Sequence, residues 1–214
     1  MSYDIITADQ NTQEWKGARI GIPSASKASD IVTSKGARSA SLPKYAHYLA
    51  ECIVAGFDVG EFSGNNSTNY GHKTEPEAIS AYELRFDCDI ERVGFCVKRD
   101  SEGNALYGCS PDGLIHIRTG GIESKSLPKE HSSTLLYYRK HGCVPSTRVP
   151  QVQMQILVCD LEYVDNWFYR PGLPSLRYRH DPDPVIQRAL KMYLPECIAL
   201  RDKHVKFLKE FTYD

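Results

Sequence analysis

The sequence predicts an α/β fold with a central mixed β-sheet flanked by helices. Three observations lead to this expectation. The 214 residues are enough to bury a substantial core, segments with helical and with strand-like apolar spacing follow one another, and no internal repeat or low-complexity tract divides the chain. We therefore expect one domain over residues 1–214, with a C-terminal helical extension from about residue 182 to residue 214.

Helical segments are indicated by their apolar spacing and by the residues at their ends. Residues 23–36 and 42–56 each start near a proline or serine and stop at a glycine, which is typical of helix ends. Residues 64–71, GNNSTNYG, are expected to form a polar loop, and residues 74–86, TEPEAISAYELRF, have helical spacing. Further helices are expected at 131–142, 150–162 and 184–211, the last with Pro195 as a kink or break.

Strand candidates are short stretches rich in β-branched and aromatic residues. They lie at residues 91–99, 105–118, 121–126, 164–172 and 175–181. The second and third candidates are expected to pair as a β-hairpin, because residues 119–121, Thr-Gly-Gly, supply a turn between them.

The charges of the chain are balanced in number but unevenly placed. With 26 basic and 27 acidic residues, the net charge of −1 indicates no partner. Residues 16–48 hold six bases and one acid, whereas residues 49–124 hold thirteen acids and six bases. This distribution is compatible with a basic groove beside an acidic pocket, the arrangement that holds a polyanion over bound metal. The alternative is that the blocks mix on the surface.

Cysteine usage and hydropathy indicate the compartment. The seven cysteines are scattered, odd in number and never spaced CxxC, which favours reduced thiols of a cytoplasmic protein over disulfides or a zinc site. The chain has no apolar run of 18 residues and no basic, apolar leader at its start. We therefore expect neither a membrane span nor a signal peptide.

The expected hairpin carries a set of charges suited to phosphodiester hydrolysis. Glu123 and Lys125 are two residues apart and so face the same side of a strand, and Asp112 joins them if the loop length is even. Carboxylates are hard oxygen ligands for Mg²⁺, and a nearby lysine can orient or deprotonate a water. In a flat hairpin Asp112 and Glu123 would be out of register, so a bend or bulge is expected. The alternative is an exposed hairpin with a surface ion pair.

Five blocks extend this interpretation beyond one short pattern. They are EWKGARIGIPSASKAS, YGHKTEPEAISAYE, GCSPDGLI, GIESKS and PQVQMQ, within roughly residues 14 to 170. In the order and approximate spacing of these blocks, the chain resembles the phage lambda exonuclease family, also described as YqaJ-like viral recombinase nucleases. The resemblance implies a restriction-endonuclease-like core with a PD-(D/E)xK site.

The resemblance also implies roles for residues of the hairpin and of a preceding helix. Asp112 and Glu123 match the metal-binding carboxylates, Lys125 the catalytic lysine, and Ser124 a backbone carbonyl that is a further metal ligand. Glu75 matches an upstream helical acid that completes the metal site. The alternative for Glu75 is an ordinary acid near the N-terminus of its helix, where the dipole favours it.

Gln153 matches the polar residue of the QVQ block at the site, although Gln151 and Gln155 compete for that register and a solvated helix face is equally compatible.

Arg19 and Ser26 form a second group of candidate site residues. Free backbone N–H groups at a helix start favour an anion, and the guanidinium of an arginine can bind a phosphate through two hydrogen bonds. In the resembled family this region binds the 5′-phosphate of the degraded strand. The alternative is a capped helix beside a surface arginine.

By this resemblance we expect a Mg²⁺-dependent 5′-to-3′ exonuclease that uses two ions, for which Mn²⁺ can substitute. It would degrade one strand of linear double-stranded DNA to 5′-mononucleotides and leave a 3′ overhang for recombination by strand annealing. The resemblance further implies a homotrimer, a single-strand annealing protein as partner, and a cytoplasmic location in a bacterial cell that carries the phage or prophage. The rival interpretations are a site-specific or structure-specific endonuclease on the same fold and a non-catalytic DNA-binding module.

Overall fold

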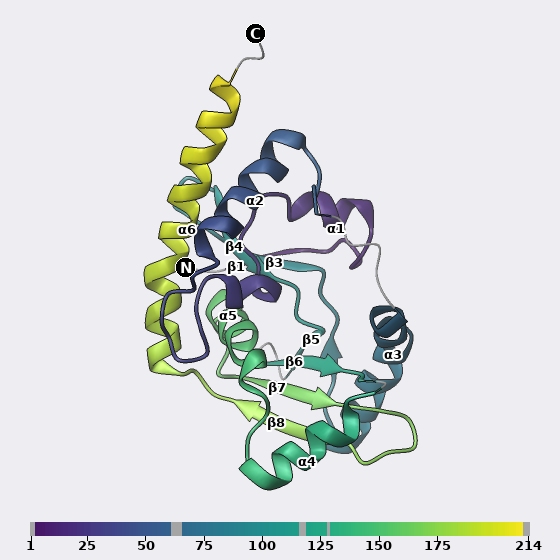
Figure 1. Cartoon of the computed structure of the whole chain (residues 1–214). Coiled ribbons are helices and arrows are strands. Elements are labelled where there is room, and N and C mark those ends of the chain that lie inside the picture. Colours follow the sequence, from purple (N-terminus) through teal and green to yellow (C-terminus); the bar gives the residue numbers. More distant parts are fainter. Residues whose placement is uncertain (1–2, 61–65, 116–118, 128, 212–214) are drawn as a thin grey trace.

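The computed structural model describes residues 3–60, 66–115, 119–127 and 129–211. Its strands form a five-stranded sheet in the order β2-β5-β6-β7-β8 and a three-stranded sheet in the order β1-β3-β4 (Figure 1). The strands are β1 (Tyr3–Ile6), β2 (Ile90–Glu91), β3 (Phe95–Arg99), β4 (Ala105–Cys109), β5 (Gly113–Ile115), β6 (Gly120–Lys125), β7 (Tyr163–Phe168) and β8 (Leu176–His180).

Helices surround the two sheets. The α-helices are α1 (Gln13–Ala18), α2 (Leu42–Ala55), α3 (Asn66–Phe86), α4 (His131–His141), α5 (Val149–Cys159) and α6 (Pro184–Glu210), and the 3₁₀ turns are η1 (Ala25–Asp30) and η2 (Ser146–Arg148). Helix α2 ends at Gly56, which adopts the left-handed conformation that glycine tolerates best.

The expected mixed sheet flanked by helices is confirmed. Strands β6 and β7 are parallel, and the other neighbours in the five-stranded sheet are antiparallel. Successive side chains of β6 point to opposite faces. Ile122 therefore packs with Ala78, Ile79 and Tyr82 of α3, whereas the adjacent Glu123 contacts α5 on the other face.

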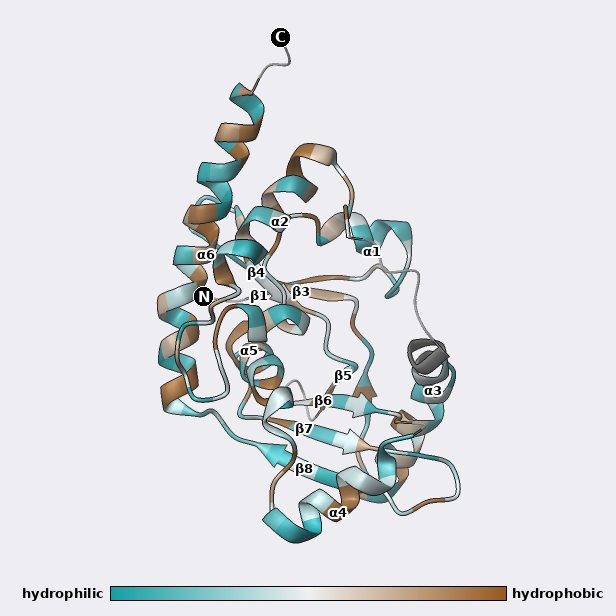
Figure 2. Cartoon of the chain, viewed as in Figure 1, coloured by the Kyte–Doolittle hydropathy of each residue, from teal (hydrophilic) through white to brown (hydrophobic). Residues whose placement is uncertain are grey.

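Two apolar clusters hold these layers together. The larger one joins α2, α5 and α6 to residues of β3 and β4, and the smaller one lies between α3 and the sheet around Trp167. Helix α6 shows alternating hydrophobic and hydrophilic bands along its length, as expected of an amphipathic helix (Figure 2). Pro195 lies inside α6 without ending it, so of the two alternatives predicted there, a kink or a break, the break is wrong.

Two local predictions differ from the structure. The segment 23–36 forms only the short η1, because the chain turns back through Gly36, which has a φ of 74°, and pairs Val32 with Arg38. The predicted loop at 64–71 is helical from Asn66, and residues 64 and 65 lie outside the described residues. Asn, Ser and Thr are common at helix starts as well as in loops, so composition alone did not separate the two.

The strand predicted at 105–118 is divided into β4 and β5. The link Ser110–Asp112 carries the chain from the three-stranded sheet to the five-stranded one, and residues 116–118 lie outside the described residues. The predicted strand at 91–99 is likewise interrupted between Glu91 and Phe95. Both interruptions lie where the two sheets meet, and the first of them carries Asp112.

Candidate active site

The register of the β5–β6 hairpin brings Asp112 opposite Glu123. Gly113 pairs with Ile122, and the Asp112 N–H donates to the Ile122 carbonyl at 3.1 Å. Continuing the pairing by one residue aligns the two carboxylates on one face. The Ser124 N–H then donates to Asp112 Oδ2 at 2.6 Å. The expected misalignment is therefore wrong, because Gly120 and Gly121 belong to β6 and not to a turn at residues 119–121. Of the expected bend or bulge, the structure has a bend at Asp112.

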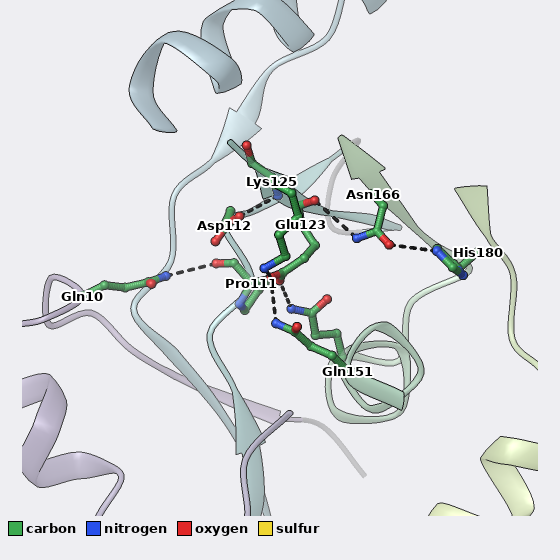
Figure 3. A network of polar contacts seen from close by, with 10 residues as sticks. Gln10, Pro111, Asp112, Glu123, Lys125, Gln151, Asn166 and His180 are labelled. Atoms are coloured by element: carbon green, nitrogen blue, oxygen red, sulfur yellow. Dashed lines mark hydrogen bonds and ion pairs between the residues drawn. The ribbon is translucent and has the colours of Figure 1, made fainter. Parts of the chain in front are cut away.

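Glu123 is held by three donors in a nearly dry environment. Its side chain is buried, and it accepts hydrogen bonds from Gln151 Nε2 at 2.7 Å and from Gln155 Nε2, on consecutive turns of α5 (Figure 3). Lys125 Nζ forms an ion pair with the same carboxylate. A buried carboxylate with this many donors stays in one orientation.

The prediction that Gln153 faces this site is wrong. Its side chain bonds instead to the segment before α6, donating to the Asp181 carbonyl at 2.7 Å and accepting from the Asp183 N–H at 2.9 Å. Residues two apart on a helix point to nearly opposite sides, whereas residues four apart share a face. The competing glutamines, Gln151 and Gln155, are the ones that reach Glu123.

The electrostatics of the hairpin indicate a shortage of positive charge. Burial and then the negative charge of Glu123 raise the pKa of Asp112 well above its usual range, and the charge of Glu75 adds to this. Burial alone would lower the pKa of Lys125, but Glu123 and Asp112 raise it. On the hairpin itself, one lysine therefore faces two carboxylates, which is a setting that favours a bound cation.

Glu75 lies within electrostatic range of Asp112 but is bonded elsewhere. It projects from α3 and forms an ion pair with Arg92, in the link between β2 and β3. Its side chain is mostly buried. The charge of Glu75 thus acts on Asp112, and an arginine that the sequence did not indicate pairs with it. Its role as a metal ligand stays a prediction.

The donor set fits a hard divalent cation. Asp112, Glu123 and Glu75 offer carboxylate oxygens, which Mg²⁺ and Mn²⁺ prefer. In addition, Gln155 Oε1 is buried with no hydrogen-bond partner among the described residues. This acceptor can take a donor such as water. The three carboxylates do not close around one point, because their oxygens are not all within 4.8 Å of one another. The Ser124 carbonyl remains a predicted ligand.

Arg19 and Ser26 lie outside the hairpin, on neighbouring segments. The Arg19 guanidinium stacks on Trp15, 3.9 Å from its ring centroid, and its Nε is buried without a partner among the residues described. Ser26 is exposed at the first turn of η1, with its Oγ 3.2 Å from that of Ser24. The Tyr45 hydroxyl accepts from the Ser24 N–H at 3.1 Å. An arginine with a free buried donor suits an anion, so the 5′-phosphate role stays a prediction.

Three residues that the sequence did not indicate support the hairpin. Gln10 Nε2 donates to the Pro111 carbonyl at 3.1 Å, and Asn166 Nδ2 donates to the Glu123 carbonyl at 3.4 Å (Figure 3). His180 Nε2 in turn donates to Asn166 Oδ1 at 2.9 Å. Burial lowers the pKa of His180 to about 4, so its ring is neutral at physiological pH. These contacts depend on tertiary pairing that no local pattern predicts.

A separate group of thiols lies in the larger apolar cluster. Cys96, Cys109 and Cys159 are buried, with sulfur atoms within 4.8 Å of one another, and none of the three is in a disulfide. Burial raises the pKa of the Cys109 thiol well above its ordinary range. The neutral thiols pack as small apolar side chains here.

Among the described helices, none combines the length and hydropathy needed to cross a membrane.

Comparisons with known proteins identify a family and similar folds. Residues 14–162 match the YqaJ-like viral recombinase domain. An alkaline exonuclease (LHK-Exo) from Laribacter hongkongensis has a TM-score of 0.77 and 25% identity, covering 92% of this chain and 96% of that one. The same protein in complex with dAMP gives 0.77 at 24% identity over the same shares.

A phage related exonuclease from Haemophilus somnus 129PT is similar in fold alone. Its TM-score is 0.65 at 13% identity, covering 87% of this chain and 96% of that one. A search of curated proteins found no significant match. The predicted family resemblance and the predicted fold are both confirmed by these findings together.

Proposed function

Since the chain belongs to the YqaJ-like viral recombinase domain family, we propose that it is a Mg²⁺-dependent 5′-to-3′ exonuclease. Its substrate would be linear double-stranded DNA, and its products 5′-mononucleotides and a 3′ single-stranded overhang for strand annealing. The observation that carries this proposal is the alignment of Asp112 with Glu123 and Lys125 on one hairpin face. The likeness to an alkaline exonuclease supports the exonuclease class.

Three side chains and one carbonyl would hold the metal. Asp112 and Glu123 are the central ligands, Glu75 completes the set from α3, and the Ser124 carbonyl is the fourth protein ligand. Two Mg²⁺ ions, with Mn²⁺ as a substitute, would supply a water of lowered pKa and neutralise charge on the leaving 3′-oxygen.

The protein's own groups then position the reaction. Lys125 is protonated, because its pKa is raised, so it donates a hydrogen bond to the attacking water and stabilises negative charge on the phosphate. Gln151 and Gln155 keep Glu123 in the orientation that faces Asp112. Arg19 and Ser26 would bind the terminal 5′-phosphate and so place the first phosphodiester at the hairpin.

The remaining parts of the proposal concern assembly. By likeness to its family, the protein would act as a homotrimer in the cytoplasm of a bacterial cell that carries the phage or prophage. It would pass its single-stranded product to a single-strand annealing protein. Sedimentation of the purified protein tests the trimer.

One gel separates the proposed function from its rivals. Linear duplex, closed circular duplex and 5′-labelled linear duplex are incubated with and without Mg²⁺. We expect digestion of the linear DNA alone, with early release of the 5′ label, and only with Mg²⁺. Cutting of the closed circle would indicate an endonuclease instead, and unchanged DNA throughout would indicate a non-catalytic binding module.

A further inference from the structure

Arg92 occupies a position that the proposed reaction does not explain. It lies in the link between β2 and β3, with a side chain that is 49% exposed, and its Nη2 pairs with Glu75 Oε1. The partner carboxylate is 20% exposed. A half-exposed arginine is therefore bonded to the one proposed metal ligand that comes from outside the hairpin.

The surroundings of Arg92 are acidic. A groove of about 820 Å³ is lined by the N-terminal segment, by Glu75 and Pro76, and by residues 91–94. Its described lining includes the carboxylates of Asp4, Asp9, Glu75 and Glu91, and Arg92 is the only basic residue in it. The groove adjoins the hairpin, because Gln10 in its wall bonds to the carbonyls of both Val93 and Pro111.

We propose that Arg92 is a DNA-phosphate-binding residue. Its ion pair with Glu75 would prevent it from contacting DNA until a divalent cation binds to Glu75. Cation binding at Glu75 would break the ion pair, and the released guanidinium would then contact the phosphate backbone in the groove. This inference rests on the proposed function in one respect, which is that Glu75 is a metal ligand.

The ion pair and the metal compete for the same carboxylate. Arg92 bonds to Oε1 of Glu75, so a cation bound at this carboxylate withdraws its negative charge from the ion pair and repels the positive charge of the guanidinium. The pair is partly exposed, so its own strength is modest and a divalent ion can displace it. Metal loading therefore removes one negative charge from the groove and frees one positive charge there.

That exchange changes what the groove can bind. With Arg92 paired, the acidic lining repels the phosphates of DNA. After cation binding, the planar fork of an arginine is suited to a phosphate oxygen pair. DNA affinity at this groove becomes coupled to metal occupancy, and by linkage DNA tightens metal binding by the same factor.

The test uses Arg92→Gln and two binding measurements that do not depend on turnover. Calorimetric titration with Mn²⁺ in the absence of DNA should show cation affinity about two- to fivefold tighter than wild type, the range expected from losing an exposed ion pair. Fluorescence anisotropy with a short 5′-phosphorylated duplex in Ca²⁺ should show DNA affinity about tenfold weaker. The salt slope of that affinity should fall by about 1. In chelator, the variant and wild type should bind DNA equally.

Arg99→Gln is the matched control. Arg99 pairs with Asp4, which lines the same groove, and its exposure is similar at 38%. Because Asp4 is not a proposed metal ligand, this variant should leave both the Mn²⁺ affinity and the metal dependence of DNA binding at the wild-type values. Thermal unfolding of each variant checks that the fold is retained.

Glu75→Gln tests the same ion pair by removing its other partner. Without the carboxylate, Arg92 is released in the absence of metal, so DNA affinity in chelator should rise, and adding Arg92→Gln should abolish the gain. Unchanged Mn²⁺ affinity in Glu75→Gln would show that Glu75 is not a ligand, which overturns the metal assignment itself. If wild type binds Mn²⁺ and Arg92→Gln has the wild-type affinities for both Mn²⁺ and DNA, the role of Arg92 alone is overturned.

Discussion

Replacing Asp112 with asparagine should stabilise the metal-free protein at neutral and alkaline pH. Burial and the charge of Glu123 raise the pKa of Asp112, so the folded state binds this proton more tightly than the unfolded chain does. The free energy of unfolding therefore falls as the pH rises from about 4, the ordinary carboxyl pKa, to the raised value. For one proton the slope is at most about 1.4 kcal/mol per pH unit. An amide does not titrate, and it can still accept from the Ser124 N–H.

Urea unfolding in chelator, across about pH 4 to pH 9, measures this effect. The Asp112→Asn variant should match wild type at the acid end and exceed it above the raised pKa. With Mg²⁺ the order should reverse, because wild type gains about 2.7 kcal/mol at a hundredfold excess over Kd and the variant gains less. Asp202→Asn, at an exposed carboxylate on α6, is the control and should show no pH-dependent gain. An Asp112→Asn variant less stable than wild type at every pH in chelator would refute the reasoning.

Three further predictions concern the reaction. Lys125→Ala should lower turnover by about 10² to 10⁴ while DNA binding in Ca²⁺ is retained; turnover within a few-fold of wild type would leave Lys125 as only an ion-pair partner of Glu123. Linear duplex with a 5′-phosphate should be digested faster than duplex with a 5′-hydroxyl, and Arg19→Ala should make the two rates converge; equal rates with the wild-type enzyme would remove Arg19 and Ser26 from the site. Ca²⁺ should support DNA binding without efficient cleavage, because its coordination is looser than that of Mg²⁺; full activity in chelator would end the metal hypothesis.

The elements that carry the candidate site residues were predicted where their signals are local in sequence. The hairpin that carries Asp112, Glu123 and Lys125 is delimited by turn residues and short strands, and these signals lie within one stretch of chain. The helix that carries Gln151 and Gln155 was also predicted, but not which glutamine faces the strand. That choice depends on how α5 is rotated against β6, which is a tertiary property.

Other features of the site lie beyond any local signal. The alignment of Asp112 with Glu123 depends on Gly120 and Gly121 pairing within β6 and not forming the turn. The pairing of β6 with β7, which places Asn166 beside Glu123, joins residues about forty apart in sequence. Arg92 reaches Glu75 because the link from β2 to β3 passes beside the middle of α3. Such contacts are set by the meeting of the two sheets.

Because Trp15 stacks on Arg19, its fluorescence should report on ligand binding at that arginine. The chain has two tryptophans. Trp15 is half-buried, and its indole N–H donates to Ser110 Oγ at 3.0 Å, two residues before Asp112. Trp167 is buried against α3 and donates to the Ala78 carbonyl. A phosphate drawn to Arg19 would alter the emission of the first indole and leave the second unchanged, so intrinsic fluorescence should follow end recognition on DNA without any added label.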